Sequence, residues 1–544
     1  MGNSIRDYHE RSKHRLDCYA PGPRFLNWAN QPYPWRTFDG TARLPFALAA
    51  DGLLARYNDL RRGVLPTAAP LDIHHVGILF ELSLALSAWK EYRGTGWALR
   101  CNPSSGNLHP TEAYLITPRL PGIEPGVYHY LSRDHVLEQR AAAQEEWCDA
   151  FRGNCVLVAL SSIYWREAWK YGMRAYRYCQ HDCGHAVAAV AYAAAAVGWQ
   201  ARVIGAAADD DIARLIGLDR ETDFASAERE APDVLMLVGD PTAAVEIEHL
   251  VERANSCTWH GRANRLSDQH VAWRDIDLVH TAAHKPRHRP AAAKLPAGLP
   301  EPGAPGLDLP AADLFRQRRS AVAFDGTTSM STEALFALLA VLLPRAEAPP
   351  WNVWPRAPAV HPVLFLHRVD GLAPGLYLFL RDPAALPDLQ RALRPEWLWQ
   401  KLGPPRLPLY LLLPDDLRNT AQLVCCHQEI AADSCFSLGM LAHLALAEQA
   451  PWRYRELFWD CGIIGQALYL EAEAAGLRGT GIGCFFDDEM HELLGLRGHE
   501  WQSLYHFTVG GPVEDVRLTS LPPYVPSAGE GGKRMPAAAA WRAT

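Results

Sequence analysis

The chain has 544 residues and a mass of 60.4 kDa, which is too large for one compact core, so we expect at least two domains. Hydrophobic residues make up 49% and charged residues 21%, which is typical of a globular protein and excludes a disordered one. The net charge of −8 argues against nucleic-acid binding, and the longest apolar run, residues 186–199, is too short to span a bilayer.

The N-terminal residues are polar and charged as far as Arg15, and no apolar segment follows that could act as a secretory signal. The twelve cysteines are scattered along the chain rather than gathered in a small scaffold. Because no export signal is visible, we expect reduced thiols and a cytoplasmic location.

The first part of the chain, residues 1–280, is predicted to combine strands with helices. Strands are expected at 113–116, 127–131, 156–160 and 234–238, and helices at 184–197 and 209–216. The helix at 184–197 is apolar on most faces, which indicates that it is buried, and Gly198 is expected to end it. Asp209 and Asp210 are suited to the start of the following helix, because carboxylates cap its unpaired N–H groups.

Residues 281–310 form the clearest break in composition. Seven prolines fall between Pro286 and Pro310, beside a short basic patch at 284–289. Proline fixes φ and removes a hydrogen-bond donor, so the composition predicts an extended linker. A contact with nucleic acid is the alternative for the basic patch, but no aromatic residues are interleaved with it, which favours a solvated linker.

The second part, residues 311–521, repeats the order of the first. Strands are expected at 363–367, 376–380, 409–413 and 504–509, and helices at 462–475 and 487–494. The strand at 409–413 is predicted to be the counterpart of 156–160. Residues 522–544 are rich in proline, glycine and alanine and are predicted to form a loose tail.

Two blocks of sequence match across the linker in the same order. Residues 182–218 align without gaps on 460–496, and His109-Pro110 matches His361-Pro362. The match indicates a tandem duplication. We therefore predict an α+β fold with two similar lobes, in each of which helices pack on a sheet.

Three segments could bind a ligand. The loop at 102–110 offers donors on Ser104, Ser105 and Asn107, although an ordinary turn would use the same residue types. The segment at 481–483 lets a ligand approach the backbone closely, but it lacks the dinucleotide-binding spacing. The arginines at 316–319 suit a phosphate, and a solvated helix face is the alternative.

Lys170 and Tyr171 could form an acid–base pair, because an ammonium group next to a phenol lowers the pKa of the phenol; a surface pair is the alternative. Two other groups have spacings that resemble metal sites, but we predict no metal, because the first leads into a buried helix. These groups are Cys179, His181, Cys183 and His185, and Cys425-Cys426-His427.

Taken together, these segments resemble the FMN-dependent nitroreductase-like superfamily, in particular its SagB/ThcOx-type dehydrogenases. The resemblance is carried by residues 8–14, the 102–110 loop, Lys170-Tyr171-Gly172, Arg318-Arg319-Ser320 with Phe324-Asp325, residues 371–377, and residues 476–496. Members of this family usually dimerise and hold FMN at the dimer interface. The resemblance thus implies two nitroreductase-like lobes that form a pseudo-dimer within one chain.

The resemblance also implies one FMN site per chain, built from both repeats. The phosphate is expected to be held by Arg318 and Ser320. The ribityl chain and ring are expected to contact Pro103, Ser104, Ser105 and Asn107. The N5/O4 edge of the flavin is expected to face Gly481, Ile482 and Gly483.

A second cleft, lined by Arg11, Gly205 and residues 355–359, is expected to be degenerate. Val322 replaces a basic residue that is common in the family, and Arg517 and Lys533 are the candidates to compensate for it.

By the same resemblance, Lys170 and Tyr171 are the catalytic residues, and they exchange a proton with the substrate while hydride passes to or from flavin N5. The implied function is an FMN-dependent oxidoreductase acting on a small molecule or peptide, including azoline-to-azole oxidation within a peptide-modifying enzyme complex. An NAD(P)H-dependent reductase of small electrophiles and a non-catalytic scaffold with a decayed flavin site are the alternatives.

Overall fold

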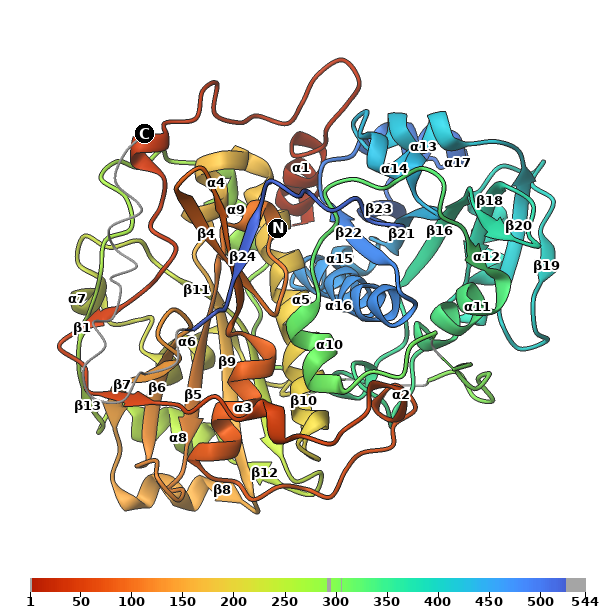
Figure 1. Cartoon of the computed structure of the whole chain (residues 1–544). Coiled ribbons are helices and arrows are strands. Elements are labelled where there is room, and N and C mark those ends of the chain that lie inside the picture. The colour runs from red at the N-terminus through yellow and green to blue at the C-terminus, as the bar shows by residue number, and fades with distance from the viewer. Residues whose placement is uncertain (1, 291–294, 305, 525–544) are drawn as a thin grey trace.

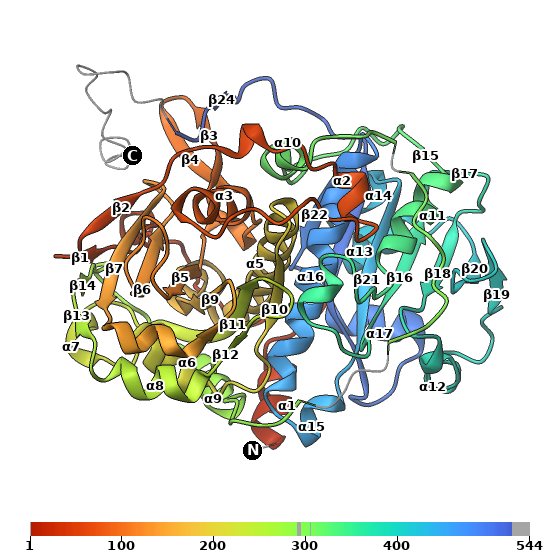
Figure 2. The same cartoon turned by 90° about the horizontal axis from the view of Figure 1, so that it is seen from below.

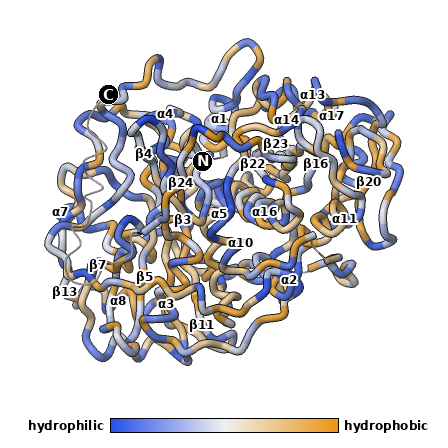
Figure 3. Tube along the Cα trace, in the orientation of Figure 1, coloured by the Kyte–Doolittle hydropathy of each residue, from blue (hydrophilic) through white to orange (hydrophobic). Residues whose placement is uncertain are grey.

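Two lobes lie side by side in the computed structural model, which describes residues 2–290, 295–304 and 306–524 (Figure 1). Each lobe is built on an antiparallel sheet that helices cover. Figure 3 shows apolar stretches along the strands and hydrophilic stretches along the connecting loops. Among the described residues, none of the helices combines the length and the hydrophobicity that a bilayer crossing needs.

The two sheets have the same strand order. The main path of the first runs β10 (Gln200–Val203), β11 (Ala231–Gly239), β9 (Cys155–Ser162), β5 (Thr111–Thr117), β6 (Gly126–Leu131), β7 (Val136–Ala142) and β13 (Thr258–Trp259), and β2 (Arg43–Pro45) also pairs with β7. The second runs β22 (Arg478–Ile482), β23 (Trp501–Gly510), β21 (Phe436–His443), β16 (Val360–Leu366), β18 (Gly375–Phe379), β20 (Leu409–Pro414) and β19 (Gln400–Leu402). This shared order confirms the predicted α+β fold of two tandem lobes.

One predicted strand equivalence was wrong. β20, at 409–414, occupies the place of β7, whereas the counterpart of β9 is β21, which the sequence analysis did not identify. β21 contains Ser437 and Gly439, so it lacks the continuous apolar run of β9. Gly439 packs tightly, because a Cβ there would lie 3.1 Å from the ring of His506.

The remaining elements are shorter or lie outside the two sheets. The helices are α1 (Gly2–Arg11), α2 (Tyr57–Leu60), α3 (Ile73–Ser83), α4 (Tyr164–Tyr171), α6 (Asp209–Ile216), α7 (Glu221–Phe224), α8 (Ile247–Ala254), α9 (Arg274–Ala282), α10 (Ala311–Gln317), α11 (Thr332–Val341), α12 (Leu386–Ala392), α13 (Arg418–Val424), α14 (Glu429–Asp433), α15 (Leu446–Gln449) and α17 (Asp487–Leu494). The short strands are β1 (Phe38–Asp39), β3 (Leu86–Tyr92), β4 (Thr95–Arg100), β8 (Phe151–Arg152), β12 (Ala244–Val245), β14 (Arg262–Ala263), β15 (Met330–Ser331), β17 (Val369–Asp370) and β24 (Thr519–Leu521).

Two long helices, α5 (Ala175–Ala196) and α16 (Arg453–Ala474), lie against each other between the sheets (Figure 2). Both begin nine residues before their predicted starts, because their first turns carry polar residues that hide the apolar pattern. One buried apolar cluster includes residues of both helices and of the inner faces of both sheets. The two lobes therefore share a core.

The helices touch through two glycines that the duplication makes equivalent, Gly184 and Gly462. A Cβ at Gly184 would overlap the carbonyl oxygen of Trp459, and one at Gly462 would overlap that of His181. Glycine normally weakens a helix interior by about 1 kcal/mol relative to alanine. Here the absent side chain is what allows the two backbones to meet.

Both ends of the described chain cross to the opposite lobe. β24 pairs with β3, and His14 forms a bridge with Phe486. The basic patch of the linker is solvated in part, since His284, Arg287 and Arg289 are exposed. Lys285 is buried and donates to the Ala207 carbonyl at 2.6 Å, and Arg287 pairs with Asp211 at 2.6 Å. The acidic start of α6 therefore neutralises the basic patch. Most of the predicted tail, 525–544, lies outside the described residues.

We predict that Gly184→Ala destabilises the protein by about 1–3 kcal/mol, because the added methyl group must displace the α16 backbone. Chemical denaturation followed by circular dichroism measures the change. Gly52→Ala is the matched control, since nothing lies within 4 Å of the Cβ position at Gly52. Equal stability of Gly184→Ala and wild type would contradict the close helix contact.

Candidate functional site

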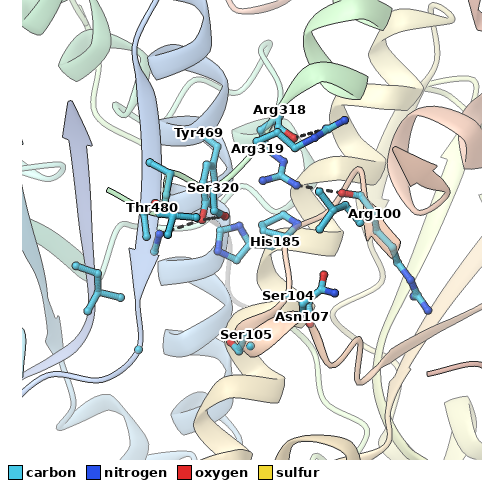
Figure 4. A pocket seen from close by; sticks show the side chains of 18 of the residues that line it. Arg100, Ser104, Ser105, Asn107, His185, Arg318, Arg319, Ser320, Tyr469 and Thr480 are labelled. Carbon is cyan, nitrogen blue, oxygen red and sulfur yellow. Dashed lines mark hydrogen bonds between the residues drawn. The ribbon is translucent and has the colours of Figure 1, made fainter. Parts of the chain in front are cut away.

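A cavity of about 660 Å³ lies between the lobes, which is within the usual range for small-molecule sites (Figure 4). Its walls come from the 102–109 loop, β3, β4 and α5 on one side, and from residues 318–322, α16 and β22 on the other. β24 and the residues before it complete the lining.

The cavity brings together both sets of residues that the sequence predicted for cofactor binding. Pro103, Ser104, Ser105 and Asn107 line it from the first lobe, and Arg318, Ser320, Gly481, Ile482 and Gly483 line it from the second. Figure 4 shows Ser104, Ser105 and Asn107 across the cavity from Ser320 and Thr480. Residues separated by more than 200 positions in sequence thus form one site.

The 102–110 loop is held in a defined conformation by its own polar groups. Gly106, Asn107 and His109 all have positive φ, between 53° and 59°. The Ser104 hydroxyl accepts from the His109 amide at 2.8 Å, and the Asn107 side chain donates to the Ala98 carbonyl at 2.9 Å. The loop is therefore more than the ordinary β-turn that was its alternative.

Asp182 on α5 also fixes the 102–110 loop, through its contacts with Ser105. Its carboxylate accepts from the Ser105 amide at 3.0 Å and from the Ser105 hydroxyl at 2.9 Å. Burial raises the pKa of Asp182 to about 7, against the lowering effect of the hydrogen bonds from Ser104 and Ser105. The site therefore contains a carboxyl group that changes its charge near neutral pH.

Tyr469 on α16 organises the opposite wall. Its hydroxyl lies 2.8 Å from the Ser320 hydroxyl and accepts from the Gly481 amide at 3.0 Å. A Cβ at Gly481 would overlap the Tyr505 hydroxyl, and one at Gly483 would overlap the Tyr178 ring. The glycines make room for the two tyrosines, and the Gly481 amide is already bonded to Tyr469.

Arg318 links the two lobes at one end of the cavity. Only 3% of its surface is exposed, and it donates through Nε to the Cys101 carbonyl and through Nη2 to the Arg100 carbonyl, both at 3.0 Å. Its guanidinium carbon lies 4.9 Å from the centre of the Tyr469 ring. This end of the cavity is thus positively charged and built from both repeats.

The basic residue that the family often places at Val322 is replaced by others. Val322 is 82% exposed, and Arg517 pairs with Asp515 at 2.7 Å and does not line the cavity. Lys533 lies outside the described residues. The cavity is instead lined by five basic residues, Lys90, Arg100, Arg318, Arg319 and Arg478, against three acidic ones, Asp182, Glu514 and Asp515. This surplus of positive charge suits an anionic group.

Of the two predicted catalytic residues, only Tyr171 lines the cavity. Its hydroxyl lies where a Cβ at Gly106 would be, and its ring packs edge-on against Tyr178 at 4.7 Å. Lys170 lies behind it, with Nζ 5.1 Å from the centre of the Tyr171 ring. Burial and the nearby Glu167 raise the pKa of Tyr171, whereas the sequence analysis predicted a lowered value.

The histidines that resembled metal ligands have other partners. His181 Nε2 lies 3.1 Å from the Leu504 carbonyl, and His185 lies between Tyr505 and Gln466. In the part of the chain that the structure describes, no three His, Cys, Asp or Glu side chains converge as a metal site requires.

The second cleft is nearly closed. Arg356, which aligns with Ser104, pairs with Asp460 at 2.7 Å and with Glu456 at 3.0 Å, and only about 20 Å³ remains beside it. Asp460 is the counterpart of Asp182, so an arginine here neutralises the equivalent carboxylate. Arg11 pairs with Asp275 and Gly205 lies under Pro290, so neither lines this space as predicted.

Several residues of the cavity were missed by the sequence analysis: Asp182, Tyr469, Arg478 and Tyr505. Asp182 could have been found, because the aligned repeat pairs it with Asp460. Tyr469 and Tyr505 carry no such signal, since each is one of several aromatic residues in its segment and is buried like the core residues around it.

Comparison with known proteins agrees with this architecture. The model of the nitroreductase family matches residues 97–227 and 408–511, one region in each lobe. The fold is therefore that of a tandem nitroreductase-like protein. The matches of the family model in both lobes confirm the predicted resemblance to that family.

Individual proteins show the same similarity. The crystal structure of a candidate nitroreductase from Anabaena variabilis covers 94% of this chain and 99% of its own, with 20% identity and a TM-score of 0.67, and so shares the fold. A candidate nitroreductase of Methanocaldococcus jannaschii is 27% identical over 147 residues, which are 25% of this chain and 68% of that protein. The Escherichia coli microcin synthetase McbBCD complex with truncated pro-MccB17 bound matches 36% of this chain and 73% of its own, with 21% identity and a TM-score of 0.26.

We predict that Asp182→Asn changes how stability depends on pH. The folded protein keeps a proton on Asp182 between pH 4 and 7 that the unfolded chain releases, so stability falls as pH rises through this range. Asparagine does not titrate, so the variant should gain up to roughly 4 kcal/mol relative to wild type between pH 4 and 8. Urea denaturation at pH 4 and pH 8 measures the difference in unfolding free energy. Asp277→Asn is the control, because Asp277 lies at an exposed position of α9.

Proposed function

We propose that the chain is an FMN-dependent oxidoreductase that binds one FMN per chain in the cavity between the lobes. The observation that carries the proposal is that the two halves of the predicted site, drawn from opposite repeats, line a single cavity. The space beside Arg356 is too small for such a ligand. This asymmetry supports one site per chain rather than two.

The residues of the cavity fit the chemistry of this cofactor. The side-chain oxygen of Asn102 is buried at the wall and has no partner among the described residues, so it can accept a hydrogen bond from a ligand. The positive end around Arg318, Arg319 and Arg478 would hold the phosphate, together with the Ser320 hydroxyl. Ser104 and Asn107 would contact the polar edge of the ring system.

When bound, FMN supplies a two-electron carrier that accepts or donates hydride. Tyr171 holds a proton at the cavity wall, because burial raises its pKa and keeps the phenol protonated at neutral pH. A protonated phenol can donate to a substrate atom that has gained negative charge. This property favours the reduction of a small electrophile, with NAD(P)H as the source of electrons.

Azoline-to-azole oxidation on a peptide, within a peptide-modifying complex, is the second candidate. It requires a base rather than an acid at the same position. The observation that favours it is the location of Lys170, whose ammonium group lies 5.1 Å from the centre of the Tyr171 ring and would stabilise a phenolate. The two candidates differ in the direction of proton transfer, so assays with a nitroaromatic plus NADPH and with an azoline peptide distinguish them.

We expect the purified protein to show a flavin absorption spectrum with one FMN per chain. Arg318→Gln should weaken FMN binding by about 10–150-fold, because it removes a charged hydrogen-bond donor. Arg11→Gln, in the opening segment of the first repeat, should leave binding unchanged, since Arg11 pairs with Asp275 on the surface. Ser320→Ala serves as a second variant should Arg318→Gln misfold. Two flavins per chain would contradict the single site, and a colourless protein that cannot be reconstituted would support the scaffold alternative.

Tyr171→Phe should leave the flavin spectrum intact and reduce turnover at least 100-fold, because it removes only the hydroxyl that carries the proton. Tyr164→Phe is the matched control on the same helix, since the Tyr164 hydroxyl bonds to His280 away from the cavity. Steady-state kinetics with both assays provide the readout. Unchanged turnover in Tyr171→Phe would remove this residue from the mechanism.

A further inference from the structure

Two cysteines meet beside the cavity and have no part in the function proposed above. Cys484 directly follows Gly483 and lines the cavity, and Cys426 lies in the turn between α13 and α14 with a φ of 53°. The segments that carry the two thiols are hydrogen-bonded to each other, and the interaction between the thiols lowers the pKa of Cys484. Both side chains are half-buried.

The two segments that carry these thiols are fixed side by side. The Phe486 amide donates to the Val424 carbonyl at 2.8 Å, and the Gln428 side chain donates to the Cys484 carbonyl at 3.0 Å. A disulfide requires Cβ atoms about 3.5–4.5 Å apart, so its formation depends on two segments that stay in register. The hydrogen bonds on either side of the pair provide that restraint.

His14 contacts the same thiol from the N-terminal segment. Its Nδ1 accepts from the Ala20 amide at 2.9 Å, so in the neutral ring the proton is on Nε2. The interaction of this ring with Cys484 lowers the pKa of the thiol. The main chain of His14 is held by Asp487, through hydrogen bonds of 3.0 Å in each direction.

The groups that face Cys484 come from every element around it. They are Cys426 from the α13–α14 turn, His14 and Tyr19 from the N-terminal segment, Tyr171 from α4, Arg174 from the turn before α5, and Tyr178 from α5. Arg174 donates to the Gly483 carbonyl at 3.0 Å, so its positive charge lies next to the thiol. Three neighbours lower the pKa of Cys484: Cys426 has the largest effect, followed by His14 and by the positive charge of Arg174. Such an environment is typical of reactive cysteines.

We propose that Cys484 and Cys426 form a redox-active dithiol that exchanges with small disulfides. Cys484 is the attacking residue, because it lines the cavity and its neighbours stabilise the thiolate. Cys426 is the resolving residue, because its segment is hydrogen-bonded to the Cys484 segment on either side of the pair.

The exchange balances without any other redox partner. The Cys484 thiolate attacks one sulfur of a disulfide RS–SR, so a Cys484–SR bond forms, the S–S bond breaks, and RS⁻ leaves and takes a proton from water. Cys426 then loses its proton to water and attacks the Cys484 sulfur, which forms the Cys426–Cys484 bond and releases the second RS⁻. The protein is oxidised by two electrons, and the substrate disulfide is reduced to two thiols. Flavin takes no part in these steps.

Incubation of the full chain with oxidised glutathione tests the proposal. We expect proteolysis and mass spectrometry to find a disulfide that joins the peptides of Cys426 and Cys484. Cys426→Ser should stop at a mixed disulfide on Cys484, and Cys484→Ser should form neither product. Cys257→Ser is the matched control, because Cys257 is equally half-buried but burial raises its pKa to about 11. Reduced thiols at 426 and 484 after incubation, or a disulfide between other cysteines, would overturn the proposal.

His14 is tested as a positioning residue by the rate at which iodoacetamide alkylates Cys484. His14→Gln should lower this rate by about tenfold at pH 6.5 and shift the pH profile upward by about one unit, because the thiolate loses its interaction with the His14 ring. Alkylation of Cys257 should not change. An unchanged profile at Cys484 would overturn the role of His14. The flavin content of each sample is measured in parallel, so that exchange by a flavin-free protein separates this proposal from the proposed function.

Discussion

The contact between α5 and α16 is the constraint on which the rest of the molecule depends. The two helices meet backbone to backbone at Gly184 and Gly462, so they cannot shift along each other without a clash. Asp182 lies one half-turn before the first glycine, and Tyr469 lies two turns after the second. The same contact that joins the lobes therefore fixes the two side chains that organise opposite walls of the cavity.

Buried ion pairs add specificity to that contact. Arg177 bonds to Asp487 at 2.7 Å, and its repeat counterpart Arg455 pairs with Asp209, so each lobe contributes one arginine and one aspartate to the other. The neighbouring arginines lower the pKa of Asp487 against the effect of its burial. Buried pairs contribute little net stability, because desolvation offsets the attraction between the charges. They strongly disfavour any other arrangement, in which these charges would be buried without partners.

Duplication within one chain allows the two interfaces to differ. In a symmetric dimer, both clefts would have identical residues. Here Ser105 bonds to Asp182 at one interface, whereas Arg356 neutralises Asp460 at the other and fills the space beside it. Segments outside the two sheets differ between the interfaces in the same way. β24 contributes to the wall of the open cavity, whereas Pro290 covers Gly205 in the first lobe. One cleft is thus available for binding and the other holds the lobes together.

The sequence by itself determined the duplication, the α+β class and most of the strands, because apolar periodicity and the gapless match of 182–218 with 460–496 are local properties of the chain. It also indicated which loop and which glycine segment line the cavity. It did not reveal Tyr469, Arg478 or the true counterpart of β9, whose roles depend on neighbours far away in sequence. Burial and Glu167 raise the pKa of Tyr171. Neither effect can be seen from the sequence, which shows only that Lys170 is adjacent. Tertiary structure also decided that Gly481 makes room for a tyrosine, since only packing shows which atoms occupy the space beside a glycine.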